Sequence, residues 1–317
     1  MSELAFELAL SAHLEQRREA ILSRQLGASV HGRRVLDTVL VEPGPDFEER
    51  AAITSETIPP AAIEGDAGPG PATFWKAAVD THPERVREVV ERAVDIGFFE
   101  RERRSGRQYV RQTARYPDDW FDRIVGIENK PDLERPGALQ TQLLTDVELA
   151  LVDEVVLATE SHVTGAHLHR IPEEVGVWRF WPDTGEREVV REATPLPTAE
   201  AGVEIIDRSS ARTEVRIATA DEKRRARRRV AERAYGKGWR TLDMPACGRV
   251  EPQNGLPYCP YHGRIVRPAS DCGESCGGYD PADPPDGDGD ALRAARTPWD
   301  PDPAGRRRRQ SGLDRYL

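Results

Sequence analysis

The stretch that decides the fold is FDRIVGIENKPD, residues 121–132, an apolar run that ends in charged and polar residues. Alternate residues of a β-strand point to the same face, so Glu128 and Lys130 should project side by side from the end of this strand. Lys130 is one of only four lysines in a chain that has 41 arginines. A carboxylate and an ammonium at the edge of an apolar sheet suit a catalytic site, and an exposed ion pair is the simpler alternative.

A second strand is predicted at residues 33–41, RRVLDTVLV, where Asp37 interrupts a β-branched run. Burying a carboxylate costs free energy unless it has a partner, so Asp37 is unusual at this position. Two carboxylates, Asp37 and Glu128, form the kind of partial oxygen cage that Mg²⁺ or Mn²⁺ accepts, with water completing the coordination. Such a cation can activate a water molecule against a phosphodiester, and Lys130 can orient that water.

The remaining periodicity indicates an α/β fold. Helical spacing of apolar residues predicts one helix over residues 3–26 and another over 136–152. The run 154–160, EVVLATE, predicts a strand directly after the second helix, and two further strands are predicted at 175–181 and 186–193. Strand, helix and strand in this order favour a parallel crossover within one sheet.

The order of these elements resembles that of the PD-(D/E)xK (restriction-endonuclease-like) nuclease superfamily: a helix, a strand with Asp37, a strand with Glu128-x-Lys130, a helix and a strand. More closely, the chain resembles an uncharacterised haloarchaeal family placed near that superfamily. The resemblance covers residues 1–44 and about 116–195. It implies a restriction-endonuclease-like mixed sheet flanked by helices, in which Asp37 and Glu128 bind the metal and Lys130 is the catalytic lysine.

Two further roles are implied by the resemblance alone. Glu7 on the first helix would take the auxiliary acidic position. Many relatives carry a glutamine on the helix after the lysine, and Gln140 is our assignment, with Gln142 as the other candidate. The aromatic residue that often follows in RecB-like members is absent, and the separation between Asp37 and Glu128 requires residues 45–115 to be an insertion.

The insertion combines a linker with a small folded unit. Residues 44–72 are rich in Pro, Gly and acidic residues and predict a mobile connection. A helix at 74–80, a second at about 84–96 and a hairpin turning at Ser105-Gly106 follow in the order of a winged helix. Such a unit either binds DNA through its hairpin arginines or serves as a plain interaction module. The arginines are Arg103, Arg104 and Arg107.

All four cysteines fall within thirty residues, which favours a metal site over a disulfide framework. They are Cys247, Cys259, Cys272 and Cys276. Four thiolates suit a closed tetrahedral Zn²⁺ site, and a [4Fe–4S] cluster is the alternative. His262, three residues after Cys259, could replace one thiolate, but a solvated histidine is the simpler interpretation. His167 and His169 could form a metal-binding pair, but alternation along a half-buried segment explains them equally well.

A net charge of −10, from 45 Lys+Arg against 55 Asp+Glu, argues at first against a nucleic-acid partner. The arginines are nevertheless concentrated, since residues 221–240 form a predicted helix with nine basic and three acidic residues. This pattern is typical of an acidic, salt-adapted surface with local basic clusters that can contact phosphates. The candidates for DNA contact on this helix are Arg224, Arg225 and Arg228.

The C-terminal segment 281–317 has few apolar residues and should be disordered. Its last eight residues follow the pattern Q-x-x-L-x-x-Y-L, which resembles the peptide by which replication and repair proteins bind the sliding clamp (PCNA). The residues that match are Gln310, Leu313, Tyr316 and Leu317. A disordered tail that forms one helical turn on binding would present these side chains together.

The sequence therefore predicts a nuclease-like core at 1–44 and 116–220, an insertion at 45–115, a basic helix and cysteine module at 221–280, and a tail at 281–317. It predicts a metal-dependent DNA nuclease of repair or replication that is tethered to the clamp. An inactive nuclease-fold DNA-binding adaptor and a winged-helix regulator are the alternatives. No run approaches the roughly 18 apolar residues of a membrane helix, and no signal peptide is recognisable, so a cytoplasmic protein without a membrane partner is expected.

Overall fold

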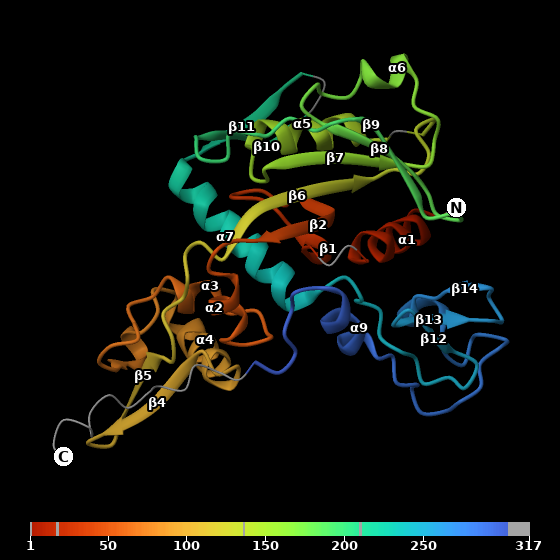
Figure 1. Ribbon diagram of the computed structural model, residues 1–317. Helices are drawn as coiled ribbons and strands as arrows, with labels where there is room; N and C mark the ends of the chain where they lie inside the picture. Colours follow the sequence, from red (N-terminus) through yellow and green to blue (C-terminus); the bar gives the residue numbers. More distant parts are fainter. Residues whose placement is uncertain (1, 17–18, 136, 209–210, 304–317) are drawn as a thin grey trace. The chain divides into compact units, whose positions relative to one another are not determined.

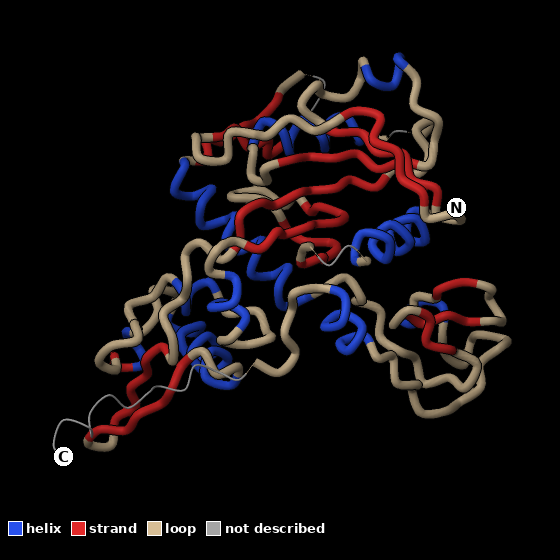
Figure 2. Tube along the Cα trace, viewed as in Figure 1, coloured by secondary structure: helices blue, strands red, loops and turns tan. Residues whose placement is uncertain are grey.

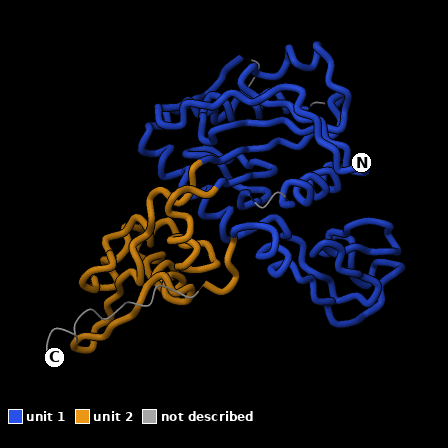
Figure 3. Tube along the Cα trace, in the orientation of Figure 1, with its two compact units in different colours: residues 1–42, 123–298 blue, residues 43–122, 299–317 orange. Residues whose placement is uncertain are grey.

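The computed structural model describes residues 2–16, 19–135, 137–208 and 211–303. It divides into two compact units (Figure 3). Unit 1 contains residues 1–42 and 123–298, and unit 2 contains residues 43–122 together with the chain from Trp299 onward. The chain therefore leaves unit 1 after its second strand and returns to it at the strand that carries Glu128. The insertion expected at 45–115 corresponds closely to unit 2.

Unit 1 is built on a six-stranded mixed sheet with the order β1-β2-β6-β7-β8-β9 (Figure 1). The pairs β1–β2 and β8–β9 are antiparallel, whereas β6–β7 and β7–β8 are parallel. The strands are β1 (Ile21–Gly27), β2 (Val35–Pro43), β6 (Phe121–Asn129), β7 (Glu154–Thr159), β8 (Gly176–Trp181) and β9 (Glu186–Arg191). Helix α5 (Leu139–Leu149) connects β6 to β7 and makes the predicted parallel crossover.

The centre of the sheet is buried because its strands are covered by helices. Helix α1 (Glu3–Glu15) begins at Ser2, whose side chain accepts a hydrogen bond from the backbone N–H of Ala5. The apolar side chains of α1 pack in one cluster with Val125 and Ile127 of β6 and with Val156 of β7. Near-continuous apolar runs such as that of β7 are characteristic of parallel strands that are buried on both faces.

The remaining elements of unit 1 are helices, drawn blue in Figure 2, and two smaller sheets, drawn red. Helix α6 (Gly165–Leu168) precedes β8, and the strands β10 (Gly202–Arg208) and β11 (Thr213–Ala218) form an antiparallel hairpin. Helix α7 (Ala220–Lys237) begins with a capping box between Thr219 and Glu222 and ends at Gly238. The cysteine segment forms a small three-stranded sheet. Its elements are β12 (Glu251–Gln253), β13 (Leu256–Cys259), β14 (Arg264–Ile265) and α8 (Pro268–Asp271).

Unit 2 contains a three-stranded antiparallel sheet with the order β3-β5-β4. Helix α4 (Pro83–Asp95) is strongly amphipathic and buries Val86, Val90 and Ala93. The hairpin β4–β5 turns at Ser105-Gly106, as the sequence predicted. The other elements are α2 (Phe47–Ala51), α3 (Pro60–Ile63), β3 (Thr73–Phe74) and a 3-10 turn (Trp75–Ala77), with β4 (Phe99–Arg104) and β5 (Arg107–Gln112).

The expectation of one helix over residues 3–26 is wrong in its second half. Helix α1 ends at Glu15, and residues 21–27 form β1 instead. Ile21 and Leu22 pair with Val41 and Leu40 of β2 and are fully buried. Apolar residues at positions 21, 22 and 26 fit both the helical and the strand periodicity. The pairing of Ile21 with the β-branched Val41 favours the strand.

Two expectations about the connecting segments also fail. Residues 44–72 contain α2 and α3 and bury Ile53, Ile58 and Ala62, so they are part of a core. The predicted helix at 74–80 is absent, because Phe74 pairs with Tyr109 of β5 and only a 3-10 turn follows.

The described part of the C-terminal segment is also structured, where disorder was expected. Helix α9 (Gly289–Arg296) lies at residues 289–296, and the Arg293 side chain is buried, donating hydrogen bonds to the carbonyls of Ala234 and Tyr235. One arginine therefore anchors a segment that is otherwise poor in apolar residues. Within the residues that the structure describes, no helix is long and apolar enough to cross a membrane.

Candidate active site

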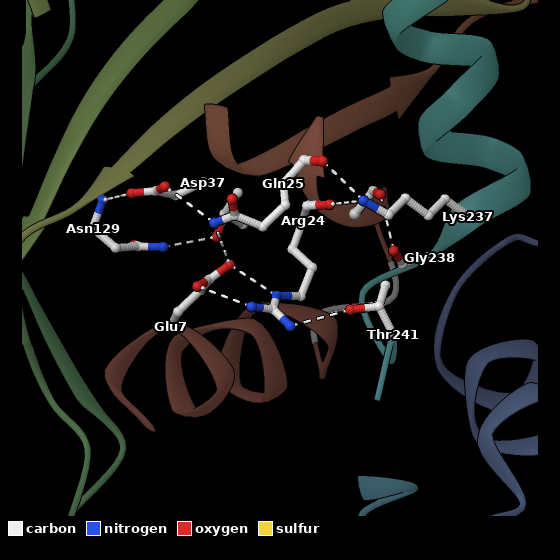
Figure 4. A network of polar contacts seen from close by, with 10 residues as sticks. Glu7, Arg24, Gln25, Asp37, Asn129, Lys237, Gly238 and Thr241 are labelled. Carbon is white, nitrogen blue, oxygen red and sulfur yellow. Dashed lines mark hydrogen bonds and ion pairs between the residues drawn. The ribbon is translucent and has the colours of Figure 1, made fainter. Parts of the chain in front are cut away.

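Asp37 lies on β2 with both carboxylate oxygens held by hydrogen bonds (Figure 4). Its Oδ2 accepts the backbone N–H of Asn129 at 2.9 Å, and its Oδ1 accepts the side-chain amide of Gln25 at 3.2 Å. Burial raises the pKa of Asp37, and these two hydrogen bonds oppose that rise. The lone Asp that the sequence marked as costly therefore has partners on both neighbouring strands, β1 and β6.

Glu7 lies on α1 and is connected to Asp37 through Gln25, whose side-chain amide donates a hydrogen bond to each carboxylate. Arg24 donates to both of its oxygens, with Nε 2.8 Å from Oε1 and Nη2 3.1 Å from Oε2. The same Oε1 also accepts the side-chain amide of Gln25 at 3.2 Å. Gln25 therefore joins the carboxylates of Glu7 and Asp37, which are the two acidic residues that the resemblance assigned to the first helix and to the Asp strand.

Glu128 forms a second, buried ion cluster with Arg34 and Asp146. Nη2 of Arg34 lies 2.7 Å from Oε2 of Glu128 and 2.7 Å from Oδ2 of Asp146, and Nε lies 2.8 Å from Oδ1 of Asp146. The Glu128 and Asp146 side chains are only 7% and 5% exposed. Burial and the nearby carboxylate of Asp37 raise the pKa of Glu128 to about 7, although Arg34 acts in the opposite direction.

Sequence reasoning missed both Arg34 and Asp146. A signal existed for Asp146, because it follows Leu139 and Leu143 on the buried stripe of α5. A carboxylate at such a position requires a partner. The signal for Arg34 was weaker, since it lies in a loop among other arginines and its partners are 94 and 112 residues away in the sequence.

The loop before Arg34 is held by a carboxylate from the β10–β11 hairpin. Glu204 is 2% exposed and accepts three backbone N–H groups, from Val30 at 2.9 Å, His31 at 2.6 Å and Gly32 at 3.0 Å. Three convergent donors fix both the carboxylate and the turn. The β10–β11 hairpin thus helps to position the loop that precedes Arg34.

Glu128 and Lys130 make separate ion pairs and do not pair with each other. Nζ of Lys130 lies 2.6 Å from Oε1 of Glu3 at the start of α1. The Lys130 side chain is 21% exposed and that of Glu3 is 66% exposed. Exposed pairs of this kind contribute little to stability, so Lys130 is held only loosely at the end of β6.

Gln140 lies at the start of α5. It lines a cavity of about 250 Å³ together with Leu143, His167 and Arg170. Gln142 lies one turn before Asp146 on the same helix. The assignment of Gln140 to the catalytic site stays a prediction.

The donor set fits a divalent cation in two respects. Asp37 and Glu128 are on neighbouring strands, and each of their carboxylates lies close enough to other carboxylates to raise its pKa. Asn129 contributes its backbone N–H to Asp37, while its side chain donates to Thr38, on the face of the sheet opposite Glu128. Among the residues that the structure describes, no three His, Cys, Asp or Glu side chains form a ready-made metal group. Mg²⁺ does not require one, because it commonly binds one or two carboxylates and keeps several waters.

The four cysteines lie in the segment after α7, with Cys259 at the end of β13 and the others in the chain around the small sheet. Cys247 and Cys259 are buried with Val250 and Val266, and Cys272 packs against this cluster. Burial and the neighbouring thiols of Cys247 and Cys259 raise the pKa of Cys272. Sγ of Cys276 lies 3.4 Å from Nε2 of His262. Three of the four cysteines pack in one cluster, and among the described residues no three His, Cys, Asp or Glu side chains form a ready-made metal group, so the predicted metal site stays a prediction.

A family model matches residues 21–281, from the first residue of β1 to the end of the cysteine segment. The chain belongs to a family of unknown function, DUF5787. The DUF5787 match includes Asp37, Glu128, Lys130 and all four cysteines, and it also includes unit 2 up to Asp122. Helix α1 with Glu7 and the C-terminal segment lie outside it. Neither a curated protein nor a solved structure matches the chain.

The arginines proposed for nucleic-acid contact lie on two separate elements of this DUF5787 chain. Those of the β4–β5 hairpin are all exposed: Arg103, Arg104 and Arg107. On α7, Arg224 and Arg225 are exposed, while Arg228 is half-buried. Arg224 pairs with Asp221 at 2.9 Å in an exposed i,i+3 bridge. The peptide proposed for the clamp, with Gln310, Leu313, Tyr316 and Leu317, lies outside the described residues.

Proposed function

We propose that this protein is a metal-dependent DNA nuclease of the PD-(D/E)xK kind. The observation that carries the proposal is that Asp37 and Glu128 lie on neighbouring strands, with Oδ2 of Asp37 accepting the backbone N–H of the residue that follows Glu128. Lys130 follows at the end of the same strand as Glu128. Apart from the unexpected strand β1 and the inserted unit 2, the order α1-β2-β6-α5-β7 is the one that the resemblance implies, which supports the same assignment.

The charge balance of the two ion clusters also supports a cation. Four carboxylates belong to them, from Glu7, Asp37, Glu128 and Asp146. Only two guanidinium groups, those of Arg24 and Arg34, lie among these carboxylates in the contacts above. With every carboxyl ionised, these carboxylates exceed the two guanidinium groups by two charges; the Lys237 ammonium, which acts on Glu7, offsets part of this excess, and a divalent cation would neutralise the rest. Burying a carboxylate without a positive partner costs free energy, so we expect a cation to bind here.

Asp37 and Glu128 would hold Mg²⁺ or Mn²⁺, which supplies Lewis-acid activation of water and neutralises charge on a phosphodiester. The hydrogen bonds from Asn129 and Gln25 orient the Asp37 carboxylate, and Arg34 orients that of Glu128. Lys130, which pairs with the exposed carboxylate of Glu3 in this structure, would orient an attacking water or stabilise the developing oxyanion.

For the cysteine module we propose a structural Zn²⁺ site, with a [4Fe–4S] cluster as the alternative. The sequence cluster and the shared packing of Cys247, Cys259 and Cys272 support a metal. His262 beside Cys276 supports either a fourth thiolate with a histidine neighbour or a histidine ligand. A small sheet of nine residues has little core of its own, and a metal commonly supplies the missing stability.

DNA and the sliding clamp are the proposed partners. In unit 2, the order α3-β3-α4-β4-β5 and the exposed hairpin arginines support a winged-helix-like DNA contact. Helix α7 supplies a second set of exposed arginines. The clamp proposal depends on the sequence of residues 310–317 alone.

One observation favours a second candidate, a catalytically inactive nuclease-fold DNA-binding adaptor. Arg34 already occupies the space between Glu128 and Asp146 and neutralises part of their charge. A fixed guanidinium at this point could replace the cation permanently. In that case the arginine clusters would bind DNA, or unit 2 would act as a winged-helix regulator, without cleavage.

Cleavage of labelled single-stranded, flapped and duplex DNA at high KCl tests the proposal. The nuclease requires Mg²⁺ or Mn²⁺ for cleavage, and Asp37→Asn and Glu128→Gln should abolish it. Asp122→Asn, which removes an exposed carboxylate from the start of the same strand as Glu128, should cleave like the wild type. DNA binding without metal-dependent cleavage of any form would favour the adaptor.

A further inference from the structure

Gln25 adopts a left-handed backbone conformation in the middle of β1, with a φ of +52°. In that strand Arg24 pairs with Thr38 and Leu26 pairs with Leu36, so Gln25 lies opposite Asp37. A residue with a Cβ rarely adopts this conformation, and it does so at a cost in free energy. Strained residues of this kind persist only where the surrounding structure holds them, and they concentrate at functional sites.

The strain has a clear geometric consequence (Figure 4). In a regular strand, successive side chains point to opposite faces, so Arg24 and Gln25 could not both reach one partner. Here both donate to Oε1 of Glu7, Arg24 at 2.8 Å and Gln25 at 3.2 Å. The left-handed conformation therefore lets the Gln25 amide reach Glu7, on the Arg24 face, as well as Asp37, the residue opposite it.

Lys237 holds the backbone at this point. Its Nζ donates to the carbonyl oxygens of Arg24 and Gln25, each at 2.8 Å. Lys237 is the last residue of α7, and Gly238 ends that helix with a φ of +66°. Because both carbonyl oxygens accept hydrogen bonds from one ammonium, Lys237 stabilises the left-handed conformation of Gln25, which a regular strand would not adopt.

The chemistry of the bridging side chain matters as well. The Gln25 amide donates one hydrogen bond to Glu7 and one to Asp37, and it is uncharged. A lysine or arginine at this position would neutralise the carboxylates, whereas the amide fixes them and leaves their negative charge in place. Each oxygen of Asp37 accepts one hydrogen bond in these contacts and so retains a lone pair for another ligand.

We propose that Gln25 is a positioning residue of the metal site: it is held in a strained conformation by Lys237 so that its amide fixes the Asp37 carboxylate for a divalent cation. This inference rests on the proposed function and adds to it a residue that does not itself touch the cation. Hydrogen-bonding partners of metal ligands typically change metal affinity about 10–100-fold when they are removed.

Two variants separate the strain from the hydrogen bonds. Gln25→Ala loses the amide and keeps the Cβ, whereas Gln25→Gly loses both and accepts a positive φ without strain. We expect both variants to bind Mn²⁺ about 10–100-fold more weakly than the wild type. We expect Gln25→Gly to melt about 2–4 °C above Gln25→Ala, because relief of a left-handed residue is a gain in stability. Ser105→Gly, at another positive φ in the β4–β5 turn, should leave Mn²⁺ affinity unchanged.

Mn²⁺ affinity is measured by titration of the full chain, with free Mn²⁺ followed by electron paramagnetic resonance, and the melting temperature is measured without metal. Asp37→Asn is titrated in parallel. Wild-type Mn²⁺ affinity in both Gln25 variants, beside a loss in Asp37→Asn, would overturn the inference alone. Equal melting temperatures of the Ala and Gly variants would overturn the role of strain. If the wild type has no Mn²⁺ site that depends on Asp37, both the inference and the proposed function are wrong.

Discussion

Nη2 of Arg34 lies 2.7 Å from Oε2 of Glu128, so a fixed cation already contacts a carboxylate that is proposed to bind metal. The same guanidinium holds Asp146 through two hydrogen bonds, and the loop that carries it is fixed by Glu204. The metal and Arg34 would therefore share Glu128, and the balance between them determines how strongly the cation binds.

Arg34→Met should destabilise the protein by about 3–5 kcal/mol in the absence of metal, because it leaves two buried carboxylates without their partner. Urea unfolding measures this loss, and Arg33→Met is the matched control, since Arg33 is the exposed neighbour. Saturating Mn²⁺ should raise the melting temperature of Arg34→Met by more than that of the wild type, because the cation can occupy the vacated position. Equal shifts would show that metal and guanidinium do not compete.

Glu128 should make the stability of the protein depend on pH in an unusual direction. Its folded pKa of about 7 is above its ordinary value of 4.5, so between these values the folded state holds a proton that the unfolded chain has lost. Wild-type stability relative to Glu128→Gln is therefore greatest below pH 4.5, falls as the pH rises toward 7, and is constant above it. Urea unfolding from pH 4.5 to 8 tests this, with Glu148→Gln as a control for the loss of one carboxyl from an exposed position. A difference that does not change with pH would contradict the raised pKa.

Glu204→Gln should loosen the loop that positions Arg34. The substitution replaces one acceptor oxygen by a donor beside three backbone N–H groups, which leaves a buried donor without a partner at a cost of about 1–3 kcal/mol. Hydrogen exchange at residues 30–32 should become faster. Glu214→Gln on the partner strand of the same hairpin removes a half-exposed carboxylate and should leave those amides protected. Unchanged protection in Glu204→Gln would mean that other contacts hold the loop.

The cysteine module should contain one zinc ion per chain, and chelation should lower the melting temperature. Cys247→Ser and Cys259→Ser, at the two buried cysteines, should each lose the metal. The sequence pattern assigns Cys276 as the fourth ligand, with His262 beside it. His262→Ala should therefore retain the metal. Elemental analysis decides the metal, and iron with visible absorbance would establish the cluster instead. A purified full chain with neither metal would contradict the module's proposed role.

The sequence was sufficient for the elements whose signals are local. The β-branched run around Asp37 and the apolar run before Glu128 form β2 and β6, and the helix and strand after Lys130 form α5 and β7. A cluster of four cysteines likewise needed no information from the rest of the chain. The strands and helices are predicted from periodicity and composition within about ten residues, and the cysteine cluster is predicted from spacing alone.

The parts that sequence reasoning missed depend on partners distant in the chain. β1 was assigned to a helix because only pairing with β2 distinguishes the two periodicities. The left-handed Gln25 is held by Lys237, which is 212 residues away, and Arg34 finds Asp146 at a separation of 112. The segment 281–303 buries Arg293 and Trp299, whose partners are distant in the sequence. Contacts of this kind leave no local pattern in a single sequence.

The most direct test of the central claim is the single-turnover rate of DNA cleavage in Mg²⁺ or Mn²⁺ by the wild type and by Lys130→Met. Lys76→Met, which removes an exposed lysine from unit 2, is the control. Loss of a group that orients the nucleophile or stabilises charge typically costs about 10²–10⁴-fold in rate, so Lys130→Met should fall by at least the lower of these factors while Lys76→Met cleaves normally. Metal-dependent cleavage at the wild-type rate by Lys130→Met would contradict the assignment of this site as a nuclease centre.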